Sequence, residues 1–131
     1  MICGLYYYSL VKLDDVIEFC SSGVCYAVKV PLNAEFPASG GTTPSYVYIY
    51  HHITEQSQAL FGFPNRDDLN LFKTLITVDG IGPASALKIM SFYPSEKIRI
   101  DIADGDADDL CKAKGVGKKS ADRIIATLKE K

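Results

Sequence analysis

The chain has 131 residues, of which 47% are apolar or aromatic, and a formal net charge of −2 at pH 7. This length and composition suit one ordinary soluble domain or two very small ones, and the overall charge does not by itself indicate a nucleic-acid-binding protein. No apolar run approaches the ~18 residues of a membrane-spanning helix, and the N-terminus lacks the basic segment and cleavage site of a signal peptide, so neither is predicted.

The N-terminal half consists of short apolar runs separated by polar breaks, a pattern typical of β-strands. The run VCYAVKV alternates, so that Val24, Tyr26, Val28 and Val30 share one face. Five short strands within residues 1–63 predict a small β-barrel. The predicted strands are residues 4–11, 16–20, 24–30, 45–53 and 58–63.

From Pro64 onward the apolar residues follow helical spacing, which predicts a small all-α domain over residues 64–131. The first helix begins at Asn65, whose side chain is the predicted N-cap, and a second begins at Pro83. A short helix is capped near Asp106, and the last helix begins at Lys118.

The segment SEKIRIDIADGD is ambiguous between strand and helix. Ile98, Ile100 and Ile102 alternate as they would in a strand. Its neighbours on both sides are helical, so we expect a short helix.

Two glycine-containing segments repeat one pattern. GIGPASALKIM (residues 80–90) and GVGKKSADRII (residues 115–125) are identical at five of eleven positions and begin 35 residues apart. In each, a glycine, an apolar residue and a second glycine precede a predicted helix, whose first amides are free to bind an anion. The pattern is also compatible with a tight connection between helices. Two matched copies favour a pair of phosphate sites, which suits a nucleic-acid backbone.

The charge is divided unevenly along the chain. Residues 1–63 carry a net charge of −3 and residues 64–131 a net charge of +1. The second repeat is locally basic, since residues 112–123 contain five lysines and arginines against Asp122 alone. Lys118 and Lys119 stand in the first turn of a helix, where cations are unfavourable unless an anion binds there. These basic residues are Lys112, Lys114, Lys118, Lys119 and Arg123.

Other motifs do not indicate a metal or nucleotide site. DGDADDLCKAKG resembles a calcium loop, but Asp109 stands where the loop needs glycine and Gly115 where it needs glutamate. His51 and His52 are adjacent on a predicted strand and therefore face opposite sides. The cysteines contain no C-x-x-C pair, so we expect reduced thiols in a cytoplasmic protein. They are Cys3, Cys20, Cys25 and Cys111.

The duplicated turns resemble tandem helix-hairpin-helix motifs. The segments MICGLYYY, SGVCYAVKVP, QALFGF, LFKTLITVDGIGP and KGVGKKSADRII, in this order, are similar to the RuvA family, the junction-binding subunits of the bacterial RuvAB complex. The resemblance covers nearly the whole chain. It implies an α+β protein, with a five-stranded OB-fold barrel in residues 1–63 and a tandem helix-hairpin-helix domain in residues 64–131. It also implies a homotetramer, or an octamer on DNA.

The resemblance implies a role in homologous recombination and DNA repair, within the SOS response to DNA damage. The protein would bind four-way (Holliday) junction DNA in the cytoplasm and hold it for branch migration. It would not be an enzyme and would need no cofactor, because a RuvB-type hexameric ATPase supplies the motor. A RuvC-type resolvase is a further implied partner, and no membrane partner is implied.

The resemblance also implies the DNA-contacting residues. Both hairpin turns and the helix starts after them would bind phosphates, although Ala84 stands where relatives often carry a base. The residues carried over are Gly80, Ile81, Gly82, Ala84, Ser85, Gly115, Val116, Gly117, Lys118, Lys119, Ser120 and Arg123.

Family members carry an acidic pin on a barrel loop that repels the DNA backbone at the crossover. It corresponds here to Glu55 and Gln56, so one of the two usual acids is an amide and we expect a weaker pin. Both could equally be ordinary solvated hairpin residues. The family continues beyond the position of Lys131 into a third domain that contacts the ATPase. A protein without that third domain is expected to bind junctions without stimulating the motor.

Two other functions remain open at this level. Some DNA glycosylases and nucleases use helix-hairpin-helix motifs, and Lys119 and Asp122 are the nearest catalytic candidates. The chain could instead be a structural oligomerisation module without DNA affinity. The many tyrosines of the N-terminal half could stack on bases, but we expect them in the barrel core and at a subunit interface.

Overall fold

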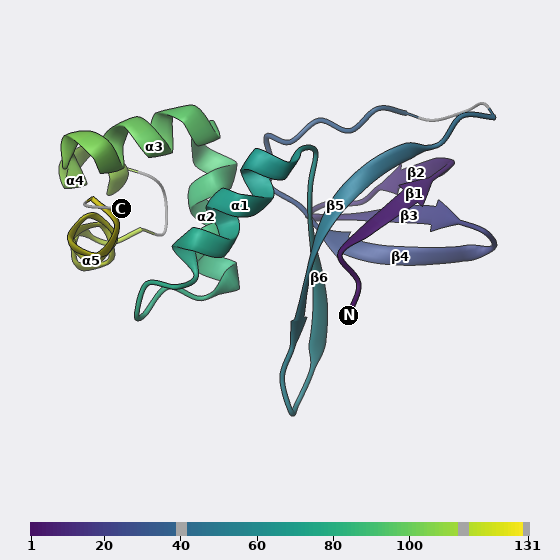
Figure 1. Ribbon diagram of the computed structural model, residues 1–131, viewed down its shortest axis with the longest axis horizontal. Helices are drawn as coiled ribbons and strands as arrows, with labels where there is room; N and C mark the ends of the chain where they lie inside the picture. Colours follow the sequence, from purple (N-terminus) through teal and green to yellow (C-terminus); the bar gives the residue numbers. More distant parts are fainter. Residues whose placement is uncertain (39–41, 113–115, 130–131) are drawn as a thin grey trace. The chain divides into compact units, whose positions relative to one another are not determined.

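A computed structural model describes residues 1–38, 42–112 and 116–129. The chain divides into two compact units, residues 1–69 and residues 70–131, and the division falls within a helix. The first unit contains the β-sheet and the second contains most of the helices (Figure 1).

The first unit is one six-stranded sheet with the order β1-β5-β6-β4-β3-β2. All neighbouring strands are antiparallel except β4 and β6, which are parallel. This is an OB-fold-like arrangement, as predicted. The strands are β1 (Gly4–Tyr7), β2 (Ser9–Lys12), β3 (Val16–Ser21), β4 (Val24–Lys29), β5 (Ser45–Ile53) and β6 (Gln58–Phe63).

The prediction of five strands is wrong by one, because the N-terminal run breaks at Tyr8. The chain changes partner there: β1 pairs with β5, whereas β2 pairs with β3. The Tyr8 amide donates to the carbonyl oxygen of Cys20 at 3.0 Å. β1 and β2 are the two edge strands, yet a single residue separates them in the chain. The sheet therefore curls toward a barrel, and in the described residues no ladder closes the seam between β1 and β2.

The core of the sheet is aromatic and β-branched. The rings of Tyr7 and Phe19 pack edge to face with centroids 4.7 Å apart, and Val28, Val47 and Ile49 are buried beside them. The predicted alternation of β4 is confirmed at Val28, which faces this core. Burial of these side chains is the main stabilising contribution to this unit.

The expectation that all cysteines are reduced is wrong for one pair, since a disulfide joins Cys20 to Cys25. The two residues are direct partners on β3 and β4, with Cα atoms 4.1 Å apart. Ser22 and Gly23 form the two-residue turn between β3 and β4, and both have positive φ, as a type I′ hairpin requires. The hairpin register brings the two sulfur atoms together, and cysteine spacing alone does not reveal that register. Cys3 and Cys111 are free thiols.

The helices follow the sheet in the order predicted. They are α1 (Arg66–Leu75), α2 (Pro83–Phe92), α3 (Ser95–Asp104), α4 (Ala107–Leu110) and α5 (Lys118–Leu128). No helix among the described residues combines the length and the apolarity needed to cross a membrane.

Two predicted helix caps are confirmed by side-chain hydrogen bonds. Asn65 Oδ1 accepts from the Asp68 amide at 2.8 Å, and Asp106 Oδ1 accepts from the Asp109 amide at 3.0 Å. The ambiguous isoleucine segment is helix α3. Ile98 and Ile102, one helical turn apart, are buried, whereas Ile100 between them is exposed.

Candidate nucleic-acid interface

The first hairpin turn connects α1 to α2 through two glycines. Gly80 has a φ of +86°, which favours glycine. Ile81 is 4% exposed and donates its amide to the Val78 carbonyl at 3.0 Å, which anchors the turn in the core. Gly82 is extended and is the N-cap of α2, and its carbonyl accepts from the Ala86 amide at 3.0 Å.

The second hairpin repeats this geometry 35 residues later. Val116 is 8% exposed, and Gly117 is extended and is the N-cap of α5. The Gly117 carbonyl accepts from the Ala121 amide at 3.0 Å, the same distance as in the first hairpin. Gly115 was also predicted to bind phosphate, and it lies outside the described residues. Over the described part, the repeat in the sequence is also a repeat in the backbone.

Both helices begin without a side-chain cap, because glycine at the N-cap offers no acceptor. The first-turn amides therefore keep the partial positive charge of a helix N-terminus. Gly82 and Ala84 are exposed in α2, as are Gly117, Lys118 and Lys119 at the start of α5. Ser85 and Ser120 are partly buried. Each helix start can accept an anion on its solvent side.

Lys118 does not point freely into solvent. Its ammonium group pairs with Asp108 of α4 and lies 3.8 Å from an oxygen of Asp122. The hydrogen bond to Asp108 raises the pKa of Lys118, and the same bond lowers the pKa of Asp108. The sequence places all three residues near one another but does not reveal that α4 presents its carboxylate to the start of α5.

Arg123 lies against the first hairpin, although it belongs to the helix of the second. Its Nη1 atom is 3.5 Å from the Asp79 carbonyl oxygen, at the outer limit of a hydrogen bond. A Cβ atom added to Gly80 would lie 2.5 Å from the same Nη1 atom. Gly80 thus serves two purposes, a positive φ and space for this guanidinium. Arg123 therefore belongs to the helix of the second hairpin and contacts the loop of the first.

Glu55 and Gln56 form the tip of the β5–β6 hairpin and are exposed. Thr54 and Ser57 close this tip, with the Thr54 amide donating to the Ser57 carbonyl at 2.8 Å and the Ser57 amide donating to Thr54 Oγ1 at 3.0 Å. β5 and β6 are paired from Tyr48 and Phe63 to Ile53 and Gln58, next to this tip (Figure 1). A single carboxylate therefore stands at the tip of this two-stranded hairpin.

Comparisons with known proteins agree with this geometry. The family described as SAM-like helix-hairpin-helix tandem matches residues 72–130. A protein of Treponema denticola named Holliday junction branch migration complex subunit RuvA is 46% identical over 122 residues, which cover 92% of this chain and 60% of that protein. A protein of the same name from Caldanaerobacter subterraneus subsp. tengcongensis is 37% identical over 116 residues, which cover 88% of this chain and 61% of that protein.

The chain thus spans about three fifths of the length of these relatives. The similarity runs through both the sheet and the tandem hairpins, since it includes 88% or more of this chain in both cases. Over the part of those proteins that it spans, the chain is similar to the proteins named RuvA.

Proposed function

We propose that this protein binds four-way junction DNA through its two helix-hairpin-helix turns and holds the junction for branch migration. The observation that carries the proposal is the matched pair of uncapped helix starts at Gly82 and Gly117. Each offers backbone amides to a phosphate, and such contacts depend on the shape of the DNA rather than on its sequence.

The proposed contacts differ between the two hairpins. Pro83 and Ala84 give the first hairpin no cationic side chain of its own, so it relies on the amides of α2 and on Arg123, which approaches its loop from α5. Lys119 adds a charge to the second, while Lys118 must exchange Asp108 for a phosphate before it contributes fully. We place this DNA-binding function in residues 64–131, and we propose that Glu55 at the tip of the β5–β6 hairpin acts as a weakened acidic pin.

The relatives are named as subunits of a branch migration complex, which supports a partner-dependent role. We infer that this chain is a non-enzymatic subunit and that a RuvB-type ATPase supplies the work. We further propose that the protein forms a homotetramer or an octamer. We also propose a RuvC-type resolvase as a further partner and a location in the cytoplasm with the chromosome.

The test is a gel-shift titration of an immobile four-way junction against a linear duplex with the sequence of its arms, over a range of salt concentrations. We expect tighter binding to the junction, and native mass measurement of the shifted complex will give the number of subunits. Equal affinity for both DNAs would reject junction selectivity, and no binding at low salt would favour a structural module. Cleavage or base release by the protein alone would identify it as an enzyme.

A matched pair of variants connects the binding to the hairpins. Lys119→Ala removes a charge at the start of α5, and Lys129→Ala removes the same charge just after the end of that helix. We expect the first to weaken binding more than the second. Equal effects would show that general electrostatic attraction, rather than the helix start, accounts for the affinity.

A further inference from the structure

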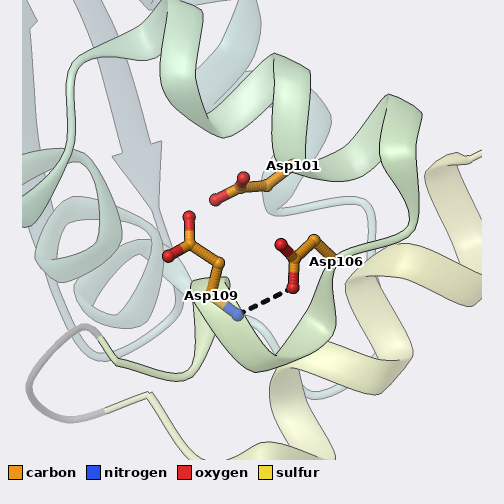
Figure 2. Close-up of side chains that lie close together, drawn as sticks. All are labelled: Asp101, Asp106 and Asp109. Atoms are coloured by element: carbon orange, nitrogen blue, oxygen red, sulfur yellow. Dashed lines mark hydrogen bonds between the residues drawn. The ribbon is translucent and has the colours of Figure 1, made fainter.

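Three carboxylates gather where α3 passes into α4. Asp101 is in the last turn of α3, Asp106 is the N-cap of α4, and Asp109 is within α4. One oxygen atom of each lies within 4.8 Å of the other two. Figure 2 shows the side chains of Asp101 and Asp109 directed toward each other, with the Asp106 carboxylate beside them.

Asp101 is the unusual member of the cluster, because it is only 4% exposed. Among the described residues, its Oδ2 atom is buried and has no hydrogen-bond partner. Burying a carboxylate oxygen without a partner is costly, and native structures nearly always supply one. The Asp101 carboxylate belongs to the cluster, so a ligand bound between the three carboxylates could supply the partner that Oδ2 lacks.

Nearby lysines compensate only part of the negative charge. Lys97 Nζ lies 2.5 Å from Asp109 Oδ2 and 3.8 Å from Asp101 Oδ1, and Lys112 Nζ lies 3.7 Å from Asp109 Oδ1. Both ammonium groups therefore lie closer to Asp109 than to the other two carboxylates. Asp106 uses Oδ1 to cap the Asp109 amide. Lys97 approaches Asp101 at Oδ1, and neither ammonium group donates a hydrogen bond to Asp101 Oδ2.

We propose that Asp101, Asp106 and Asp109 form a binding site for a hard divalent cation. Oxygen-only ligands select Ca²⁺ and Mg²⁺ over softer metals. Ligand oxygens on opposite sides of Ca²⁺ are about 4.6–5.2 Å apart, twice its usual bond length, so the spacing of the three carboxylates is close to that of one Ca²⁺ coordination sphere. Mg²⁺, with a sphere about 4.1 Å across, needs the carboxylates to close in, so Ca²⁺ is the preferred ion.

This site differs from the calcium loop that the sequence excludes. That loop would use Asp104, Asp106 and Asp108, of which the proposed site shares only Asp106, and Asp108 is engaged with Lys118. The proposed ligands instead come from two helices and the connection between them. A cation there would tie α3 to α4, the element that carries Asp108 and leads to the second hairpin.

The experiment is calorimetric titration of the chelator-treated full chain with CaCl₂ and, separately, MgCl₂. We expect one saturable Ca²⁺ site per chain, tighter than the Mg²⁺ site, with a matching rise in the unfolding temperature. Asp101→Asn and Asp109→Asn should each lose the saturable heat, whereas Asp104→Asn, with the same charge change outside the cluster, should keep it. No saturable heat at concentrations up to about 10 mM, above the 10⁻⁴–10⁻³ M range of weak calcium modules, would overturn the proposal.

Lys97→Met provides a second test, because Lys97 competes with the cation for the same carboxylates. We expect this variant to bind Ca²⁺ at least several-fold more tightly. If Lys97→Met leaves the affinity unchanged or lowers it, or if Asp104→Asn loses the heat as well, the site is not the one proposed.

Discussion

The ammonium group of Lys118 is paired with the carboxylate of Asp108, which lies ten residues earlier in the chain, on α4. Lys118 is the first residue of α5, so the pair occupies the solvent side of the second hairpin's helix start. Both side chains are largely exposed, at 56% and 83%. The carboxylate thus stands where the proposed DNA phosphate would bind, and the phosphate has to replace it.

Asp108→Asn should therefore increase affinity for junction DNA by a few-fold. The neutral side chain no longer competes for Lys118, which then contributes one more neutralised phosphate, so the slope of log affinity against log salt should steepen by up to about 0.9 per subunit. Gel shifts over a salt series measure both quantities. Asp104→Asn removes an equal charge without freeing Lys118, and an equal gain in that variant would contradict the mechanism.

The lysines at the start of α5 should contribute unequally. Lys118→Ala and Lys119→Ala together should flatten the salt slope by between one and two phosphates per subunit, because each lost contact removes about 0.9 from the slope and Asp108 competes for Lys118. Lys119→Ala should have the larger single effect, because Lys118 is already shared with Asp108 and Asp122. The same salt series measures this. An unchanged slope in the double variant would show that neither side chain touches phosphate.

Gly80→Ala should destabilise the helical unit by about 1–3 kcal/mol. The new Cβ requires a strained positive φ and would lie 2.5 Å from Arg123 Nη1. Gly82→Ala is the matched control, because Gly82 is extended and a Cβ there meets nothing within 4 Å. Chemical denaturation of both variants measures the difference in the free energy of unfolding. Equal losses would mean that neither the positive φ nor the packing of Arg123 matters.

The pH dependence of stability should identify Asp101. Burial, followed by the neighbouring Asp109, raises the pKa of Asp101 from 3.8 to about 6. Between these values the unfolded chain releases a proton that the folded chain keeps, so this carboxyl lowers stability as pH rises through that window. Lys97 and Asp106 also face the group.

Asp101→Asn removes this penalty, and the amide can still donate a hydrogen bond to Asp109. In chelator, it should stabilise the protein by on the order of 1–3 kcal/mol at about pH 7.5 and by much less at about pH 4.5. Denaturation curves at the two pH values measure the gain. A gain of the same size at both would show that folding does not raise the pKa of Asp101.

Local patterns were sufficient to predict most of the fold. Asn65 and Asp106 cap their helices because capping depends on residues three positions away, which the sequence displays directly. The break at Tyr8 could not be predicted, since it reflects a change of partner strand rather than a local signal. The Cys20–Cys25 bond depends in the same way on the register of a hairpin.

The candidate site was predicted as a set of residue types but not as a set of contacts. The repeat identified both helix starts, because glycine, a buried apolar residue and a helix follow each other in the chain. Arg123 and Asp79 lie against each other although they are 44 residues apart in the chain. The pairing of Lys118 with Asp108 depends on how α4 packs against α5. Such contacts arise from tertiary packing, which residue spacing does not encode.

Gln56→Asp should sharpen the preference for a four-way junction over linear duplex. It restores a second carboxylate at the tip of the β5–β6 hairpin beside Glu55, where both side chains are exposed. Added negative charge repels any DNA backbone that passes close to the tip. In the proposed complex the tip meets the crossover of a four-way junction. A linear duplex has no crossover, so its affinity should change by a different amount. Thr54 and Ser57 hold the tip and are unchanged, so the hairpin itself should keep its shape. Gel shifts measure the ratio of the two affinities, and Glu55→Gln is the opposite change. If the ratio stays constant across both variants, the pin is not part of the function.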